Sequence, residues 1–113
     1  MCFNGIPTYM QVISDRNNSN KRLNYYDMNM QKCSLSQINM KANYNIDDIL
    51  PIRFDLMKQY ASLLSRDFKF VRVDFYEVKG RIYLGEMTFT PAAFLFRYVN
   101  AEDEIKDGKL LTL

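Results

Sequence analysis

The stretch FVRVDFYEVKGRIYLGEMTFTP, residues 70–91, decides how this chain is expected to fold. Residues 70–77 and 81–90 are rich in β-branched and aromatic side chains, which is typical of strands. Gly80 separates the two runs, and Pro91 ends the second because proline cannot donate a hydrogen bond to a strand ladder. The stretch therefore predicts a closing β-hairpin over about residues 69–90.

Charged side chains lie inside both predicted strands. Arg72 and Asp74 fall in the first strand, and Glu86 falls in the second, two residues before Thr88. The positions around them are apolar on both faces, and a sheet of that kind is usually covered on both sides. Charges in such a place are costly unless they are paired or bound to a metal ion. We therefore look for a functional site in this hairpin.

The length of the turn decides whether the two carboxylates meet. With a two-residue loop of Lys79 and Gly80, Asp74 pairs with Gly85. Because side chains alternate between the faces of a strand, Asp74 and Glu86 would then point to opposite faces.

A three-residue loop over residues 78–80 changes this geometry. Arg72 then lies opposite Glu86, and Asp74 is the diagonal neighbour of Glu86, about 7–8 Å away on the same face. This loop favours a left-handed glycine at its last position, where Gly80 stands, so we expect the longer loop. One face would then carry Arg72, Asp74, Tyr76, Glu86 and Thr88.

Two carboxylates and a hydroxyl on one face suit a magnesium ion. Mg²⁺ takes oxygen ligands and commonly uses one or two carboxylates together with phosphate oxygens, which makes Asp74, Glu86 and Thr88 candidate ligands. The guanidinium of Arg72 suits a phosphate or a carboxylate. The alternative is a purely structural ion pair between Arg72 and Glu86, with Asp74 at a solvated rim.

The N-terminal part of the chain predicts short strands joined by polar turns. Asn4-Gly5 is a strong turn dipeptide, so residues 1–15 are expected to form a β-hairpin, with a strand over residues 9–13. Residues 15–22 are polar and turn-prone, and residues 23–26 suit either a short strand or a bend.

The remainder predicts one main helix. Residues 51–66 are expected to be helical, with Pro51 in the first turn. The predicted core-facing stripe is Ile52, Leu56, Tyr60, Leu63 and Leu64. Residues 34–45 show no clear periodicity of apolar residues and are expected to be irregular. The tail over residues 92–113 suits either a short helix or coil.

Composition narrows the classes of function. The chain has 113 residues, a formal net charge of +2, two cysteines and no histidine. The length suits one small domain, and the small charge, spread along the chain, does not favour nucleic-acid binding. Without histidine, Ser-His and Cys-His catalysis are excluded. Two cysteines without a disulfide or zinc spacing favour a reduced, cytoplasmic location. Neither a signal peptide nor a membrane-spanning run is visible.

The hairpin sequence is similar to the closing hairpin of ATP-grasp enzymes. D-alanine–D-alanine ligases show R-x-D, a hydrophobic strand, a Gly turn, then E-x-N and Pro; Arg72, Asp74 and Glu86 keep this pattern, and Thr88 stands in place of Asn. GEMTFTP, together with CFNGIPTYMQVISDR (residues 2–16) and NYYDMNMQKC (residues 24–33), resembles the TupA-like ATP-grasp family more specifically.

The resemblance implies a fold and a chemistry. The chain would be a single partial domain over residues 1–113, an α+β C-terminal ATP-grasp subdomain, mainly antiparallel sheet, whose N-terminal subdomains are absent. Members use Mg²⁺ and ATP to activate a carboxylate as an acyl phosphate. The TupA-like family is associated with teichuronic acid and other cell-surface polysaccharides, and its proteins are also labelled glycosyltransferases, so the implied activity is that of a ligase or a glycan-synthesis transferase. Asp74 and Glu86, with Thr88, would hold the metal ion, and Arg72 would hold a phosphate, the acyl phosphate or Glu86 itself.

Further site residues and partners also follow from the resemblance. Arg16, Lys21 and Arg22 lie where members place basic residues and are candidates for phosphate or substrate contact. The expected ligands are the nucleotide and a small carboxylate or glycan precursor. Activity of this chain alone is not expected. The alternative is a non-catalytic interaction module that forms a homodimer or pairs with a separate N-terminal lobe.

Overall fold

The computed structural model describes residues 1–14, 21–35, 48–89, 98 and 100–110. Within them the chain is α+β, as the sequence predicts. The strands are β1 (Cys2–Phe3), β2 (Ile6–Pro7), β3 (Met10–Ser14), β4 (Arg22–Tyr26), β5 (Phe70–Val78) and β6 (Arg81–Thr88). The helices are α1 (Phe54–Ser65) and α2 (Ala101–Leu110).

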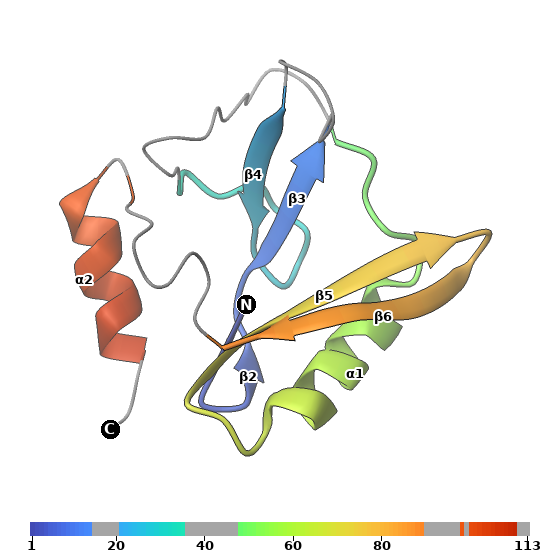
Figure 1. The fold of residues 1–113 in the computed structure, drawn as a ribbon. Coiled ribbons are helices and arrows are strands. Elements are labelled where there is room, and N and C mark those ends of the chain that lie inside the picture. Colours follow the sequence, from blue (N-terminus) through green and yellow to red (C-terminus); the bar gives the residue numbers. More distant parts are fainter. Residues whose placement is uncertain (15–20, 36–47, 90–97, 99, 111–113) are drawn as a thin grey trace.

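The described strands form two antiparallel sheets. The larger has the order β2-β1-β5-β6, and the smaller is the β3–β4 ribbon. The long β5–β6 hairpin has α1 along one side and the β3–β4 ribbon on the other (Figure 1). Since neighbouring residues of a strand point to opposite faces, β5 presents one set of side chains to α1 and the other set to the side of the ribbon.

Two hydrophobic clusters hold these parts together. Cys2, Ala61 and Val71 pack between the sheet and α1, with Val73, Phe75 and Met87 against them. The larger cluster lies on the other face and is largely aromatic; its buried members are Met1, Phe3, Tyr9, Leu23, Tyr25, Leu35 and Tyr98. Both faces of β5 are therefore covered near its N-terminal end, as the apolar pattern on both faces predicts.

The N-terminal hairpin is confirmed, but its second strand is not the predicted one. Asn4 and Gly5 both have positive φ, and the turn pairs Phe3 with Ile6. The predicted strand over residues 9–13 exists as β3, which pairs with β4 in the other sheet. Residues 23–26 are thus a strand. Most of the polar loop (15–20) and most of the segment without a clear period (36–45) lie outside the described residues.

The helix begins later than predicted and buries a different face. It starts at Phe54, and its buried residues are Phe54, Ala61 and Ser65. Ile52, Tyr60 and Leu63, all in the predicted stripe, are exposed. Leu56 and Leu64 of the stripe are half-buried. Small side chains at Ala61 and Ser65 let this face of the helix lie close to the sheet, and Tyr60 and Leu63 point away from it.

The turn of the closing hairpin also differs from the prediction. The loop has two residues, Lys79 and Gly80, with φ of 51° and 75°, and Val78 pairs with Arg81. Two successive positive φ values are the signature of a type I′ turn, whose twist matches the flanking strands. The predicted three-residue loop over residues 78–80 is therefore wrong. The predicted end of the strand at Pro91 lies outside the described residues.

Candidate functional site

A β-bulge brings Asp74 and Glu86 to the same face despite the short turn. From the turn inward the register runs regularly to Phe75 and Leu84, and the next pair is Asp74 with Glu86. Gly85 is thus an extra residue on β6. An inserted residue shifts the alternation of side chains by one, which reverses the faces. Asp74 and Glu86 are therefore direct cross-strand neighbours, closer than the predicted diagonal arrangement.

Arg72 joins the two carboxylates. Its Nε donates to Oδ1 of Asp74 at 2.8 Å, and its Nη2 donates to Oδ2 at 2.9 Å. The same Nη2 donates to Oε1 of Glu86 at 3.3 Å and to the hydroxyl of Thr88 at 3.5 Å. A bidentate contact of this kind holds the guanidinium in one orientation. The expected phosphate-binding residue and the three candidate metal ligands thus come together. We call them the charged face: Arg72, Asp74, Glu86 and Thr88.

The charged face is partly shielded on one side and open on the other. The side chains of Arg72 and Asp74 are 25% and 29% exposed, whereas that of Glu86 is 60% exposed. Asp74 is thus not at a solvated rim. Contacts between charges weaken with exposure, so the Arg72–Asp74 pair is the firmer one and Glu86 is freer to accept another partner.

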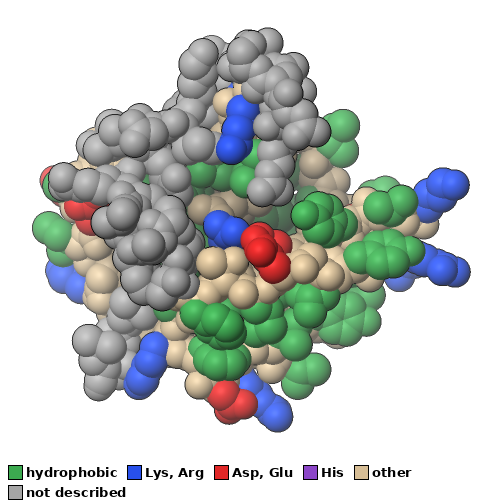
Figure 2. Space-filling view, viewed as in Figure 1, with side chains coloured by type: hydrophobic (Ala, Val, Ile, Leu, Met, Phe, Trp, Pro, Cys, Tyr) green, Lys and Arg blue, Asp and Glu red, His purple; other side chains and the backbone are tan. Residues whose placement is uncertain are grey.

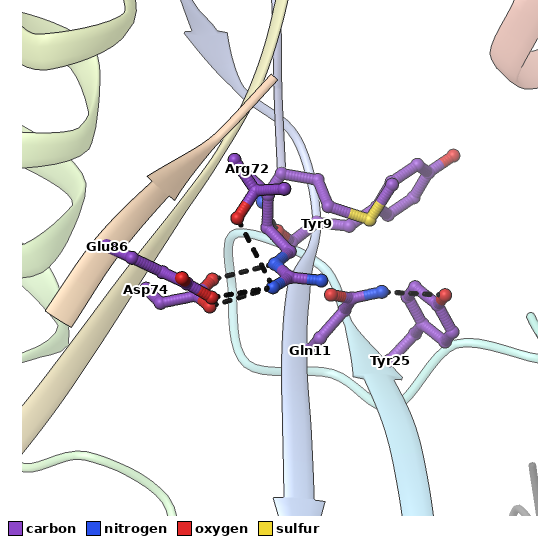
Figure 3. A network of polar contacts seen from close by, with 8 residues as sticks. Tyr9, Gln11, Tyr25, Arg72, Asp74 and Glu86 are labelled. Atoms are coloured by element: carbon purple, nitrogen blue, oxygen red, sulfur yellow. Dashed lines mark hydrogen bonds and ion pairs between the residues drawn. The ribbon is translucent and has the colours of Figure 1, made fainter. Parts of the chain in front are cut away.

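The β3–β4 ribbon contributes a polar side chain opposite the charged face. Gln11 of β3 donates from Nε2 to the hydroxyl of Tyr25 at 2.8 Å. Its amide group points toward the guanidinium of Arg72 (Figure 3). Tyr25 is fully buried, so it provides a fixed support for Gln11. The site is consequently flanked by both sheets.

Aromatic side chains continue the face toward the hairpin tip. Tyr76 pairs directly with Tyr83, and both are about half exposed. A Cβ atom placed on Gly85 would lie 2.5 Å from Cε2 of Tyr76, so the tyrosine ring lies over this glycine. In the space-filling view, hydrophobic side chains adjoin the acidic patch and Lys and Arg side chains project beyond them (Figure 2). The face therefore has a charged end and an aromatic end.

The charged face fits part of a magnesium site. Asp74, Glu86 and Thr88 offer carboxylate and hydroxyl oxygens, the ligand type that Mg²⁺ requires. Each carboxylate oxygen has two lone pairs, so Asp74 can accept from Arg72 and still bind a cation. No group of three or more metal-ligating acidic or cysteine side chains exists among the described residues. Further ligands would have to come from water or phosphate, as is common for this ion.

Arg22, the basic candidate that lies in a described strand, is at the end of the ribbon away from Gln11. Arg22 pairs with Ser14 at the end of the β3–β4 ribbon, three residue pairs beyond Gln11 and Tyr25. At about 3.4 Å per residue this is roughly 10 Å along the ribbon. Lys21 directly precedes β4, and Arg16 lies outside the described residues. Their proposed contacts with phosphate remain a prediction.

A second polar cluster lies on the β3–β4 ribbon and is structural. Asp48 accepts hydrogen bonds from Ser14 (2.7 Å), Asn24 (2.8 Å) and Tyr26 (2.6 Å). Burial alone would raise the pKa of Asp48, but these three donors outweigh it and the pKa is lowered. A carboxylate stabilised in its charged form is a poor general acid. The cluster serves to tie the segment before α1 to the ribbon.

Three site features escaped the sequence analysis, and one had a visible signal. An isolated glycine within a strand pattern often marks a bulge, and Gly85 directly precedes Glu86. Tyr76 was expected on this face, but its pairing with Tyr83 depends on the corrected register, and the place of Gln11 depends on how the two sheets meet.

Comparison with known proteins gives one match. The family model described as TupA-like ATPgrasp matches residues 1–111. No curated protein and no solved structure matches the chain. The matched range includes Asp74, Glu86 and the rest of the charged face. In the part of the chain that the structure describes, no helix is long and apolar enough to span a membrane.

Proposed function

Since this chain belongs to the TupA-like ATP-grasp family, we propose that its charged face binds the magnesium-bound phosphates of ATP. The observation that carries the proposal is the direct pairing of Asp74 with Glu86, which the bulge at Gly85 produces. Two like charges opposite each other destabilise a sheet unless something neutralises them. Arg72 supplies one positive charge to the pair, and a cation shared by both carboxylates would offset the remaining negative charge.

Arg72 has a second role in this proposal. Its guanidinium donates to both carboxylates and so keeps them oriented while the metal ion is absent. On ligand binding, the same group is placed to donate to a phosphate oxygen next to the ion, because guanidinium groups bind phosphate in a bidentate manner. The Tyr76–Tyr83 pair, beside the carboxylates, offers a surface on which a ring of the ligand can stack.

The wider function follows from the family. We infer that the chain acts as the C-terminal part of a cytoplasmic ATP-dependent enzyme of cell-surface polysaccharide synthesis. Bound Mg-ATP would supply the phosphoryl group that activates a carboxylate. The charged face is open at Glu86, so a second lobe would be needed to enclose the nucleotide. Exclusion of water strengthens the electrostatic contacts of such a site, and we therefore expect little turnover by this chain alone.

The test is a titration with ATP in the presence and absence of Mg²⁺, followed by the amide NMR signals of Asp74, Gly85 and Glu86. We expect these signals to shift only when both ATP and Mg²⁺ are present. Glu86→Gln removes one charged ligand and should weaken binding about tenfold, which corresponds to about 1.4 kcal/mol.

Glu102→Gln is the matched control, because Glu102 is an exposed carboxylate in the first turn of α2. It should leave the affinity unchanged. Shifts that do not depend on Mg²⁺, or equal weakening by the two variants, would contradict the proposal.

The edge of the larger sheet favours a second candidate function. Among the described strands β6 pairs only with β5, and its outer edge has no strand partner within that part of the chain. Tyr83 and Leu84 on this strand are half exposed. Unpaired edges with apolar side chains are templates for pairing with another chain. The chain would then act as an interaction module that dimerises or receives a separate lobe.

Light scattering at increasing concentration tests this alternative. Leu84→Lys places a charge on the edge strand and should abolish any dimer, because inward or edge lysines block strand pairing. Ile105→Lys, which charges an exposed position of α2, is the control. A monomer at all concentrations would exclude the homodimer.

A further inference from the structure

An open groove of about 600 Å³ runs along the outer side of α1. Its walls are side chains of α1, together with Pro7 of β2 and Met28 from the turn after β4. The inner side of α1 packs with Val71 through Ala61, and Arg72, the next residue of β5, points to the other face. The α1 groove and the charged face are therefore on opposite sides of the sheet.

A lysine stands at one end of the α1 groove in a fixed position. The Nζ of Lys58 donates to the carbonyl oxygen of Met28 at 3.2 Å and lies 5.2 Å from the ring centre of Phe54. It also pairs with Asp55 at 3.2 Å, but the Asp55 side chain is 92% exposed. Exposed ion pairs contribute little, so the ammonium remains available to a further anion.

An arginine stands at the other end. Arg66 follows Lys58 by eight residues, which at 1.5 Å per residue corresponds to about 12 Å along the helix. Its side chain is 69% exposed, and its contact with Asp67 is 4.0 Å long, at the limit of an ion pair. The two cations thus mark the ends of an elongated site.

Between the cations the α1 groove is mostly apolar and offers two polar side chains. Gln59 and Ser62 line it on the helix, and the described lining contains no aspartate or glutamate. Leu63 and Pro7 supply apolar surface. Amide and hydroxyl groups between two cations match a ligand with hydroxyl groups between two anionic ends.

We propose that the α1 groove binds a phosphorylated sugar with two separated anionic groups. One phosphate lies at Lys58, the other at Arg66, and the sugar hydroxyls face Ser62 and Gln59. The separation of the two anionic groups would determine which ligands bind tightly, because a ligand with one phosphate reaches only one of the two cations. This site is independent of the proposed nucleotide site.

The test compares fructose 1,6-bisphosphate with fructose 6-phosphate as probes, following the amide signals of Ser62 and Leu63. We expect the bisphosphate to bind at least about tenfold more tightly than the monophosphate. Arg66→Gln should reduce the affinity for the bisphosphate to that for the monophosphate, and the monophosphate should still bind because Lys58 remains. The charged face should show no shifts, so the result does not depend on the nucleotide site.

Arg81→Gln is the matched control, since Arg81 is an exposed arginine at the hairpin tip. Equal weakening by Arg81→Gln and Arg66→Gln would show non-specific charge attraction and overturn the proposal. Equal affinity for fructose 1,6-bisphosphate and fructose 6-phosphate would overturn it as well, and so would the absence of shifts in the amide signals of Ser62 and Leu63.

Discussion

At the scale of single residues, Gly85 determines the geometry of the charged face. It is the extra residue that places Asp74 opposite Glu86, and the ring of Tyr76 lies over it. A side chain here would meet Cε2 of Tyr76 at 2.5 Å and the carbonyl oxygen of Asp74 at 3.2 Å. The half-exposed tyrosine ring can move aside, whereas the backbone oxygen can yield only slightly.

We therefore predict that Gly85→Ala lowers the free energy of unfolding by about 1 kcal/mol and displaces Tyr76. Urea denaturation and the ring signals of Tyr76 would measure the two effects. Gly108→Ala is the control, because nothing lies within 4 Å of a Cβ atom there. Gly108 is inside α2, so this change should stabilise the protein by up to about 1 kcal/mol. If both substitutions changed the free energy of unfolding in the same direction, the close contact at Gly85 would not explain the loss of stability.

Arg72 is the second decisive residue, because its guanidinium contacts both facing carboxylates and offsets one of their two charges. Arg72→Gln should destabilise the protein by about 2 kcal/mol, since Asp74 loses its charged partner and repels Glu86. Mg²⁺ should restore part of the loss, and its effect on the melting temperature should be larger in the variant than in the wild type. A melting temperature of Arg72→Gln that does not respond to Mg²⁺ would argue against a cation site at these carboxylates.

At the scale of elements, the start of α1 depends on a side chain from β5. Arg53, at the N-cap position, makes no side-chain capping bond. Glu77 instead accepts hydrogen bonds from the backbone N–H groups of Ile52 (3.2 Å) and Arg53 (3.1 Å). The first N–H groups of a helix lack partners within it, and a negative charge at this end is stabilising. This contact fastens the far end of the hairpin to the helix.

Glu77→Gln removes the charge and keeps the size of the side chain. We expect the free energy of unfolding to fall by about 0.5–1 kcal/mol and hydrogen exchange to accelerate in the first turn of α1. Asp67→Asn, an exposed carboxylate beyond the C-terminal end of the helix, should have almost no effect. Faster exchange in the last turn instead of the first would refute this capping role.

At the scale of the whole molecule, α2 is attached to the aromatic cluster through a buried carboxyl group. The hydroxyl of Tyr98 donates to Oδ2 of Asp107 at 2.6 Å. The other oxygen, Oδ1, is buried without a hydrogen-bond partner in the part of the chain that the structure describes. Burial raises the pKa of Asp107, nearby Asp103 adds to this, and hydrogen bonding and Lys106 oppose it. Burial, together with Asp107, also raises the pKa of Tyr9 to about 12.

The sign of the pH effect follows from the raised pKa. The folded state holds the Asp107 proton more tightly than the unfolded state does, so its contribution to stability is full below the unfolded value of 3.8 and is lost as pH rises through the folded value. Asp107→Asn cannot ionise and still accepts from Tyr98. We predict that it is more stable than the wild type at pH 7 and that the difference shrinks toward pH 3. Urea midpoints across this range provide the measurement, and a difference independent of pH would contradict it.

The sequence by itself determined the α+β class, the closing hairpin and the members of the charged face. The hairpin and the charged face follow from local composition: β-branched and aromatic runs, a turn glycine, and charges at positions that would otherwise be apolar. The α+β class was implied by the family resemblance. The family resemblance over most of the chain was equally visible and is confirmed over residues 1–111. Such features need only neighbouring residues to be recognised.

Only the tertiary structure decided how these residues meet. The two-residue turn and the bulge at Gly85 compensate each other, so the shared face of Asp74 and Glu86 was predicted correctly from a wrong register. The outward face of α1 and the approach of Gln11 to Arg72 also depend on contacts between distant segments. Bulges and packing faces are chosen by the free energy of the assembled sheet and helix, which periodicity along one strand or helix does not contain.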